Sequence, residues 1–156
     1  MPKPEASPHS IELMAKRLIN TTLKAQGVNY RVEIVDVLSN AADLNHSVEV
    51  GVPGVSLKYS GGTEQHTNPV LSSSLQFTAY LTQQQRDNVM SVLYSDAEYG
   101  LVAGLYIVDD QNVEKLEWCG LVIPDQTSET VDNGSGYITV TFSCTDGLPL
   151  LKHKNF

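Results

Sequence analysis

A chain of 156 residues and 17.0 kDa has the length of one domain, which excludes a two-domain enzyme. Hydrophobic residues make up 41% and charged residues 18%, a balance that supports one core and excludes a disordered chain. The net charge of −8 has the wrong sign for neutralising phosphates, so we expect no dedicated DNA- or RNA-binding surface. Residues 1–24 carry +2 and residues 25–156 carry −10.

The first 27 residues predict an arm followed by an amphipathic helix. Residues 1–8 are rich in proline and predict an extended arm. Ile11, Met14 and Leu18 then fall on one face of a helix that would end at Gly27. This face is expected to pack either against the domain's own core or against a neighbouring subunit. In the second case Ile11, Met14 and Leu18 are candidate subunit-interface residues.

From residue 28 onward the hydrophobic period changes to two, which predicts β-strands. The predicted strands cover residues 30–37, 48–50, 55–59, 75–81, 101–108, 115–123, 127–131 and 137–144. Thr82 is typical of the cap of a second helix that extends to about Tyr94. The acidic stretch 109–112 predicts a hairpin turn, and Asn133-Gly134 is a preferred pair for another.

These elements predict a mainly β fold with two helices, an α+β class. The simplest architecture is an antiparallel β-barrel or sandwich with one inserted helix across an opening and an N-terminal helix. Residues 1–27 are expected to form the arm and amphipathic helix, and residues 28–156 a single β-barrel-like domain.

The sequence predicts neither a membrane span nor a secreted protein. No apolar stretch approaches the roughly 18 residues of a membrane helix, and charges in residues 11–19 argue against a signal-peptide core. We therefore expect a protein that stays in the cytosol where it is made. Cys119 and Cys144 both lie among apolar residues and lack metal or redox spacing, so both are predicted to be buried free thiols.

Motifs for catalysis, metal binding and cofactor binding are missing from the sequence. There is no nucleophile elbow, zinc-protease motif, phosphate loop or dinucleotide fingerprint, and the four histidines are scattered. We expect no catalytic residues, no metal, no cofactor and no enzyme activity. An alternative function is a β-sandwich module that binds carbohydrate or peptide through Tyr59, Tyr80, Tyr99 and Tyr106.

The C-terminal third holds the most distinctive residues. Trp118 lies on a strand that Pro124 should halt, followed by Asp125. A second strand ends in a Thr-Asp-Gly-Leu turn, where Asp146 can accept backbone N–H groups and Gly147 allows a left-handed backbone before Leu148. Taken alone, these residues indicate a structural motif.

These residues belong to a longer pattern that resembles a known family. The pattern consists of the stretches 28–34, 55–59, 69–77, 116–125 and 140–152, and the Trp118 strand and the turn at Asp146 are its most specific parts. It resembles the N-terminal domain of tail-tip proteins of tailed bacteriophages, of the distal-tail or baseplate-hub type. The resemblance covers roughly residues 28–156.

The resemblance implies a virion structural protein with a β-barrel of the tail-tube or hub type. Such a protein would form a homo-oligomeric ring, a trimer or hexamer, around a channel through which DNA passes as cargo. Its partners would be other tail proteins, and it would assemble in the host cytoplasm and reside in the virion, with no role for a membrane. Family members continue into further domains, so the chain is either a compact version or the first domain of a longer protein.

Overall fold

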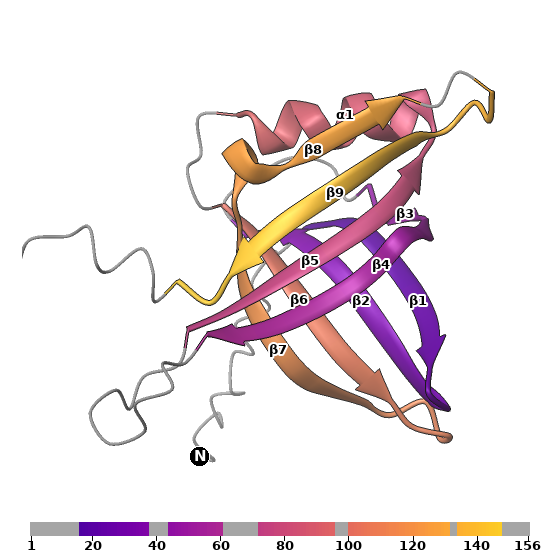
Figure 1. Ribbon diagram of the computed structural model, residues 1–156, viewed down its shortest axis with the longest axis vertical. Coiled ribbons are helices and arrows are strands. Elements are labelled where there is room, and N and C mark those ends of the chain that lie inside the picture. The colour runs from indigo at the N-terminus through magenta and orange to yellow at the C-terminus, as the bar shows by residue number, and fades with distance from the viewer. Residues whose placement is uncertain (1–15, 38–43, 61–71, 96–99, 132–133, 148–156) are drawn as a thin grey trace, which may run out of the picture.

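The computed structural model describes residues 16–37, 44–60, 72–95, 100–131 and 134–147. This part of the chain is mostly β, with one α-helix (Figure 1), so the predicted mainly β class is confirmed. The strands are β1 (Lys16–Ala25), β2 (Val28–Asp36), β3 (His46–Ser47), β4 (Glu49–Ser60), β5 (Ser72–Leu81), β6 (Leu101–Val108), β7 (Glu114–Val122), β8 (Ser128–Val131) and β9 (Ile138–Thr145). The helices are α1 (Gln83–Leu93) and the short 3-10 helix η1 (Pro124–Gln126).

All of these strands belong to one sheet, in the order β3-β1-β2-β6-β7-β9-β5-β4, with β8 added to β9. Only the β1–β3 pair is parallel among the described strands. β3 and β4 stand at opposite ends of this order, yet only Val48 separates them along the chain. The sheet therefore curls until its ends meet, and there the Val48 N–H donates to the carbonyl of Asn20 at 3.1 Å. In the described ranges no ladder joins β4 to β1, so the curled sheet is not closed.

The predicted N-terminal helix is wrong for residues 16–25, which form β1. β1 pairs with β2 down to Ala25↔Val28, and Gln26 and Gly27 make the two-residue turn between them. Their positive φ angles of 52° and 82° are typical of a type I′ hairpin turn. Gly27 therefore reverses the chain within a sheet, where the sequence pattern had suggested the end of a helix.

A β-bulge explains why β1 resembles a helix in sequence. The register with β2 shifts between Arg17 and Ile19, so Leu18 and Ile19 are adjacent and both are fully buried. Two consecutive inward side chains break the alternation expected of a strand and imitate a helical face. The residues N-terminal to Lys16, which include Ile11 and Met14, lie outside the described residues.

The predicted strands 48–50 and 55–59 are parts of one long strand, β4. Its register with β5 runs from Val50↔Ala79 to Val55↔Phe77, so residues 51–54 form a bulge. Val52 in this bulge is 80% exposed. The glycines and proline here interrupt the ladder without ending the strand.

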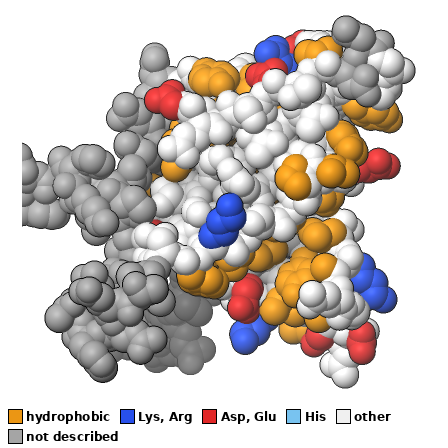
Figure 2. Space-filling model, in the orientation of Figure 1, with side chains coloured by type: hydrophobic (Ala, Val, Ile, Leu, Met, Phe, Trp, Pro, Cys, Tyr) orange, Lys and Arg blue, Asp and Glu red, His pale blue; other side chains and the backbone are white. Residues whose placement is uncertain are grey.

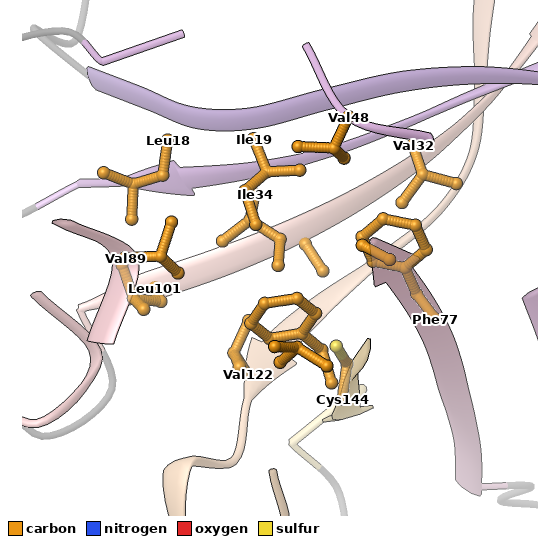
Figure 3. Packing of buried hydrophobic residues seen from close by; sticks show 14 of the residues in the cluster. Leu18, Ile19, Val32, Ile34, Val48, Phe77, Val89, Leu101, Val122 and Cys144 are labelled. Atoms are coloured by element: carbon orange, nitrogen blue, oxygen red, sulfur yellow. The ribbon is translucent and has the colours of Figure 1, made fainter. Parts of the chain in front are cut away.

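Helix α1 covers one end of the curled sheet (Figure 1). Thr82 caps it as predicted, because its side-chain oxygen accepts from the Gln85 N–H at 3.3 Å while the Gln85 side chain accepts from the Thr82 N–H at 3.0 Å. Figure 3 shows Val89 of α1 beside Leu18 of β1 and Leu101 of β6. All three side chains are buried in one core cluster. The inserted helix therefore lies across an opening, as the sequence predicted.

The hairpin of β6 and β7 is confirmed, and its turn depends on Asp109. The Asp109 carboxylate accepts from the backbone N–H groups of Gln111 and Val113 at 2.9 and 2.8 Å. The predicted final hairpin is also present, since β8 pairs with β9 as far as Val131↔Ile138. Asn133 of its expected turn lies outside the described residues.

β7 and β9 approach each other closely at Gly120. Their ladder includes Leu121↔Thr145 and Val122↔Cys144, just after this glycine. A Cβ atom at Gly120 would lie 2.3 Å from the carbonyl oxygen of Thr145 and 2.5 Å from Cη2 of the Trp118 ring. Only glycine leaves room for both the Thr145 backbone and the indole ring.

We expect Gly120→Ala to lower the free energy of unfolding by about 2–3 kcal/mol, because the added methyl group meets a backbone oxygen that cannot rotate away. Urea unfolding followed by circular dichroism measures the change. Cys119→Ala, one residue away at an exposed position, is the matched comparison and should change stability by less than about 0.5 kcal/mol. Equal stability of Gly120→Ala and the wild type would show that β7 and β9 are not so close.

Candidate functional site

The two sequence motifs of the C-terminal third meet in one buried cluster. Trp118 of β7 donates its indole N–H to the hydroxyl of Ser73 on β5 at 2.8 Å. The Ser73 hydroxyl donates in turn to the carboxylate of Asp146 at 2.8 Å, and the Ser73 backbone N–H donates to the same oxygen at 2.5 Å. Ser73 is only 7% exposed and its proton is committed to Asp146, so the cluster fixes three strands together and offers no accessible nucleophile.

The other predicted motif residues lie around this cluster. Pro124 opens η1 and Asp125 lies in its first turn, so the Trp118 strand ends where predicted. Gly147 has a φ of +87°, the left-handed conformation that the sequence suggested. Leu148 lies outside the described residues. Sequence reasoning missed Ser73, which lies in a run of three serines that carries no signal for this role.

Two sets of predicted surface residues do not form a common surface. Leu18 is fully buried in the core of its own chain, which leaves it no exposed atoms with which to contact another subunit. Among the tyrosines of the alternative binding module, Tyr59 is 62% exposed at the end of β4, whereas Tyr106 is committed to a charged network on β6. Tyr99 lies outside the described residues, and Tyr80 lies half-buried on β5.

A charged network covers the outer face of β2. Arg31 binds both carboxylate oxygens of Glu114 at 2.6 Å, binds Glu33 at 2.5 Å and lies 4.2 Å from the centre of the Tyr106 ring. Glu33 also accepts from Arg17 at 2.8 Å and from the Tyr106 hydroxyl at 2.7 Å. Arg31 and Glu33 alternate with apolar residues along β2, a pattern typical of solvent-facing side chains, yet they are only 8% and 6% exposed.

The electrostatics of this network favour the charged form of Glu33. Burial opposes ionisation, but the hydrogen bonds from Arg31 and Tyr106 and the positive charges of Arg31 and Arg17 outweigh it. The pKa of the Glu33 carboxyl is therefore below its ordinary value. Burial and the hydrogen bond to Glu33 also raise the pKa of the Tyr106 hydroxyl. The network acts as a clamp between β1, β2, β6 and β7.

A pocket opens at the end of the curled sheet opposite α1. Its cavity of about 370 Å³ lies between β4 and the ends of the β1–β2 and β6–β7 hairpins. Figure 2 shows hydrophobic side chains gathered in this part of the visible surface. The lining residues are mainly apolar and include Leu23, Tyr30, Val55, Leu57, Leu105 and Ile107, with the polar side chains of Gln26 and Glu117 beside them.

The outer face of β4, β5, β8 and β9, termed here the hydroxyl face, is almost uncharged. Figure 2 shows this face in front, mostly white with a basic side chain near its middle. The register of the four strands aligns its outward positions, of which Thr78, Ser143 and Thr145 are buried. The outward side chains that are at least partly exposed are chiefly Ser56, Ser74, Gln76, Tyr80, Ser128, Thr130, Thr139 and Thr141. Among the described residues in these rows, only Lys58 and Glu49 carry a charge.

The two cysteines differ, which corrects the prediction that both are buried. Cys144 is 2% exposed in the core, and burial raises the pKa of its thiol to about 12. Cys119 is exposed, because it follows the inward-facing Trp118 on β7 and alternation turns it outward. Both are free thiols.

Comparison of the chain with protein-family models, with curated proteins and with solved structures finds no match. Within the described ranges, no three His, Cys, Asp or Glu side chains come close enough together to hold a metal ion. None of the helices in those ranges is long and apolar enough to cross a membrane.

We expect Glu33 to make stability depend on pH. Its pKa is lower in the folded than in the unfolded chain, so its stabilisation is present above the ordinary pKa of 4.5 and is lost as pH falls through the folded value. Between about pH 5 and pH 3 the wild type should therefore lose more stability than Glu33→Gln. Urea unfolding at both pH values measures this, with the exposed Glu49→Gln as a comparison that should follow the wild type. If the wild type and Glu33→Gln lost the same free energy of unfolding between these pH values, the proposed stabilisation by Glu33 would be contradicted.

We expect iodoacetamide at about pH 8 to modify Cys119 and not Cys144, because the Cys144 thiol is buried and protonated. Mass spectrometry of the native protein should show one added group, and two after denaturation in urea. Cys119→Ser should show none until it is unfolded. Rapid labelling of native Cys119→Ser would contradict the placement of Cys144.

Proposed function

We propose that the protein is a structural subunit of a homo-oligomeric ring in the tail tip, baseplate or tail tube of a tailed bacteriophage. In this proposal the curled sheet is a barrel of the tail-tube or hub type, repeated around a channel for DNA. The support comes from the family resemblance of residues 28–156 and from the hydroxyl face. The ring would contain three or six subunits and contact other tail proteins.

The hydroxyl face carries the proposal because of the charge on the rest of the chain. Identical subunits with a net charge of −8 repel one another, so they associate most easily through a surface that lacks acidic groups. The cores of protein interfaces are similarly depleted of charged residues. The partly exposed side chains of the hydroxyl face span four strands and include one acid, Glu49 at the end of β4, and one base, Lys58.

A closed ring places this face against a different surface of the next subunit, since head-to-tail contacts generate rings. The exposed Lys58 lies opposite Ser74 on the hydroxyl face and favours an acidic neighbour. The turn between β6 and β7 contains Asp109 and Asp110 and is one such acidic surface. Acidic side chains left outside the contact would line the channel, where like charge lets DNA slide.

We expect Gln76→Glu to weaken assembly at least tenfold, because it puts a negative charge inside the uncharged contact without changing side-chain size. Sedimentation velocity of the wild type should show a closed oligomer, and electron microscopy should show rings. Gln84→Glu on α1 makes the same chemical change at an exposed position away from the face and should leave assembly intact.

A stable wild-type monomer at high concentration would overturn the ring. If Gln76→Glu and Gln84→Glu assembled equally well, the hydroxyl face would not be part of the contact between subunits. Lys58→Glu should weaken assembly at least as much as Gln76→Glu, because it reverses a charge.

A further inference from the structure

We propose that the pocket at the open end of the sheet binds a small amphipathic cation: an apolar chain or ring system with a primary ammonium group. The site lies on the inner side of the sheet and so is separate from the hydroxyl face. Its volume of about 370 Å³ is within the usual range of roughly 300–1,000 Å³ for pockets that bind small molecules.

The walls select an apolar body. Leu105 at the base is buried, while Leu23, Val55, Leu57 and Ile107 are partly exposed in the absence of a ligand. Burying their exposed surface against a ligand releases water and favours binding, by about fourfold in affinity for each buried methylene group.

The rim selects a positive charge. Glu117 and Gln26 lie at the exposed edge of the pocket, and Glu117 is the only charged side chain among the residues that line it. Every ion pair of the described residues involves other acids, so the Glu117 carboxylate is available for a ligand. Lys115, two residues earlier on β7, does not line the pocket. An ammonium group at the rim would bind Glu117 while the apolar body fills the interior.

The divergence of the strands keeps this end open. β1 pairs with β3 only at Ile19 and Asn20, and β4 pairs only with β5 among the described strands. Beyond Asn20 the ends of the sheet therefore separate, and Leu23 of β1 faces the cavity from one side while Leu57 of β4 faces it from the other. The pocket is therefore a consequence of the way the strands diverge.

The test uses three probes with the same ten-carbon chain: decylammonium, decanol and decanoate. The two ions are used below their micelle concentrations and decanol below its solubility limit. Isothermal titration calorimetry should show the order decylammonium, decanol, decanoate, with about a tenfold difference between the two ions. Hexylammonium should bind much more weakly than decylammonium, because it buries fewer methylene groups.

Glu117→Gln should lower decylammonium affinity by about fivefold and leave decanol affinity unchanged. Glu49→Gln removes an exposed carboxylate from the same chain outside the pocket and should change neither affinity. Leu57→Gln should weaken all three ten-carbon probes.

Failure of all three probes to bind the wild type would overturn the pocket as a ligand site. If Glu117→Gln did not weaken the binding of decylammonium, the assignment of a cationic ligand would be wrong. If chain length did not affect the affinity, the assignment of an apolar body would be wrong. Sedimentation of the same samples separates this result from the proposed ring, because Glu117→Gln leaves the hydroxyl face unchanged.

Discussion

The close approach of β7 to β9 at Gly120 is the constraint on which the rest of the sheet depends. The Trp118 ring occupies the space that a side chain at Gly120 would need, and the same ring donates to Ser73, which donates to Asp146. At this glycine an indole on β7, a hydroxyl on β5 and the carboxylate of the residue that follows β9 come together in one cluster. A buried network whose members are satisfied fixes a single arrangement, because a displaced member would leave an unpaired polar group.

The two ends of the curled sheet on either side of this junction differ in how they are filled. β7 pairs with β6 from Glu114 to Leu121 but with β9 only at Leu121 and Val122, and beyond these two pairs β9 continues beside β8. At one end α1 fills the opening with Val89 and Leu93, so the core is sealed there. At the other end the sheet has no helix to fill it in the described residues, and the strands separate into the pocket. The sheet therefore has one end closed by a helix and one end that is open in the described residues.

The sequence predicts the strands and α1 well because their signals are local: alternation, a capping threonine and turn residues. It fails at β1 because a bulge puts Leu18 and Ile19 on the same side, and at Gly27 because a helix end and a type I′ turn both favour glycine. The Ser73 cluster, the burial of Arg31 and the pocket depend on which strands become neighbours. That information is distributed across the chain, so spacing along the sequence cannot supply it.

The distribution of charged side chains distinguishes three regions of the surface: the network on β2, the hydroxyl face and the rim of the pocket. On β2 the buried acid Glu33 is compensated by Arg31 and Arg17, which makes that wall a rigid clamp with little charge left for a partner. On the hydroxyl face the described outward rows contain one acid, Glu49 at the end of β4, which permits approach of a second acidic subunit. Glu117 is different from both, because it is an exposed acid with no ion pair in the described residues, beside an apolar cavity. The negative charge of Glu117 therefore favours a cation at the mouth of the pocket.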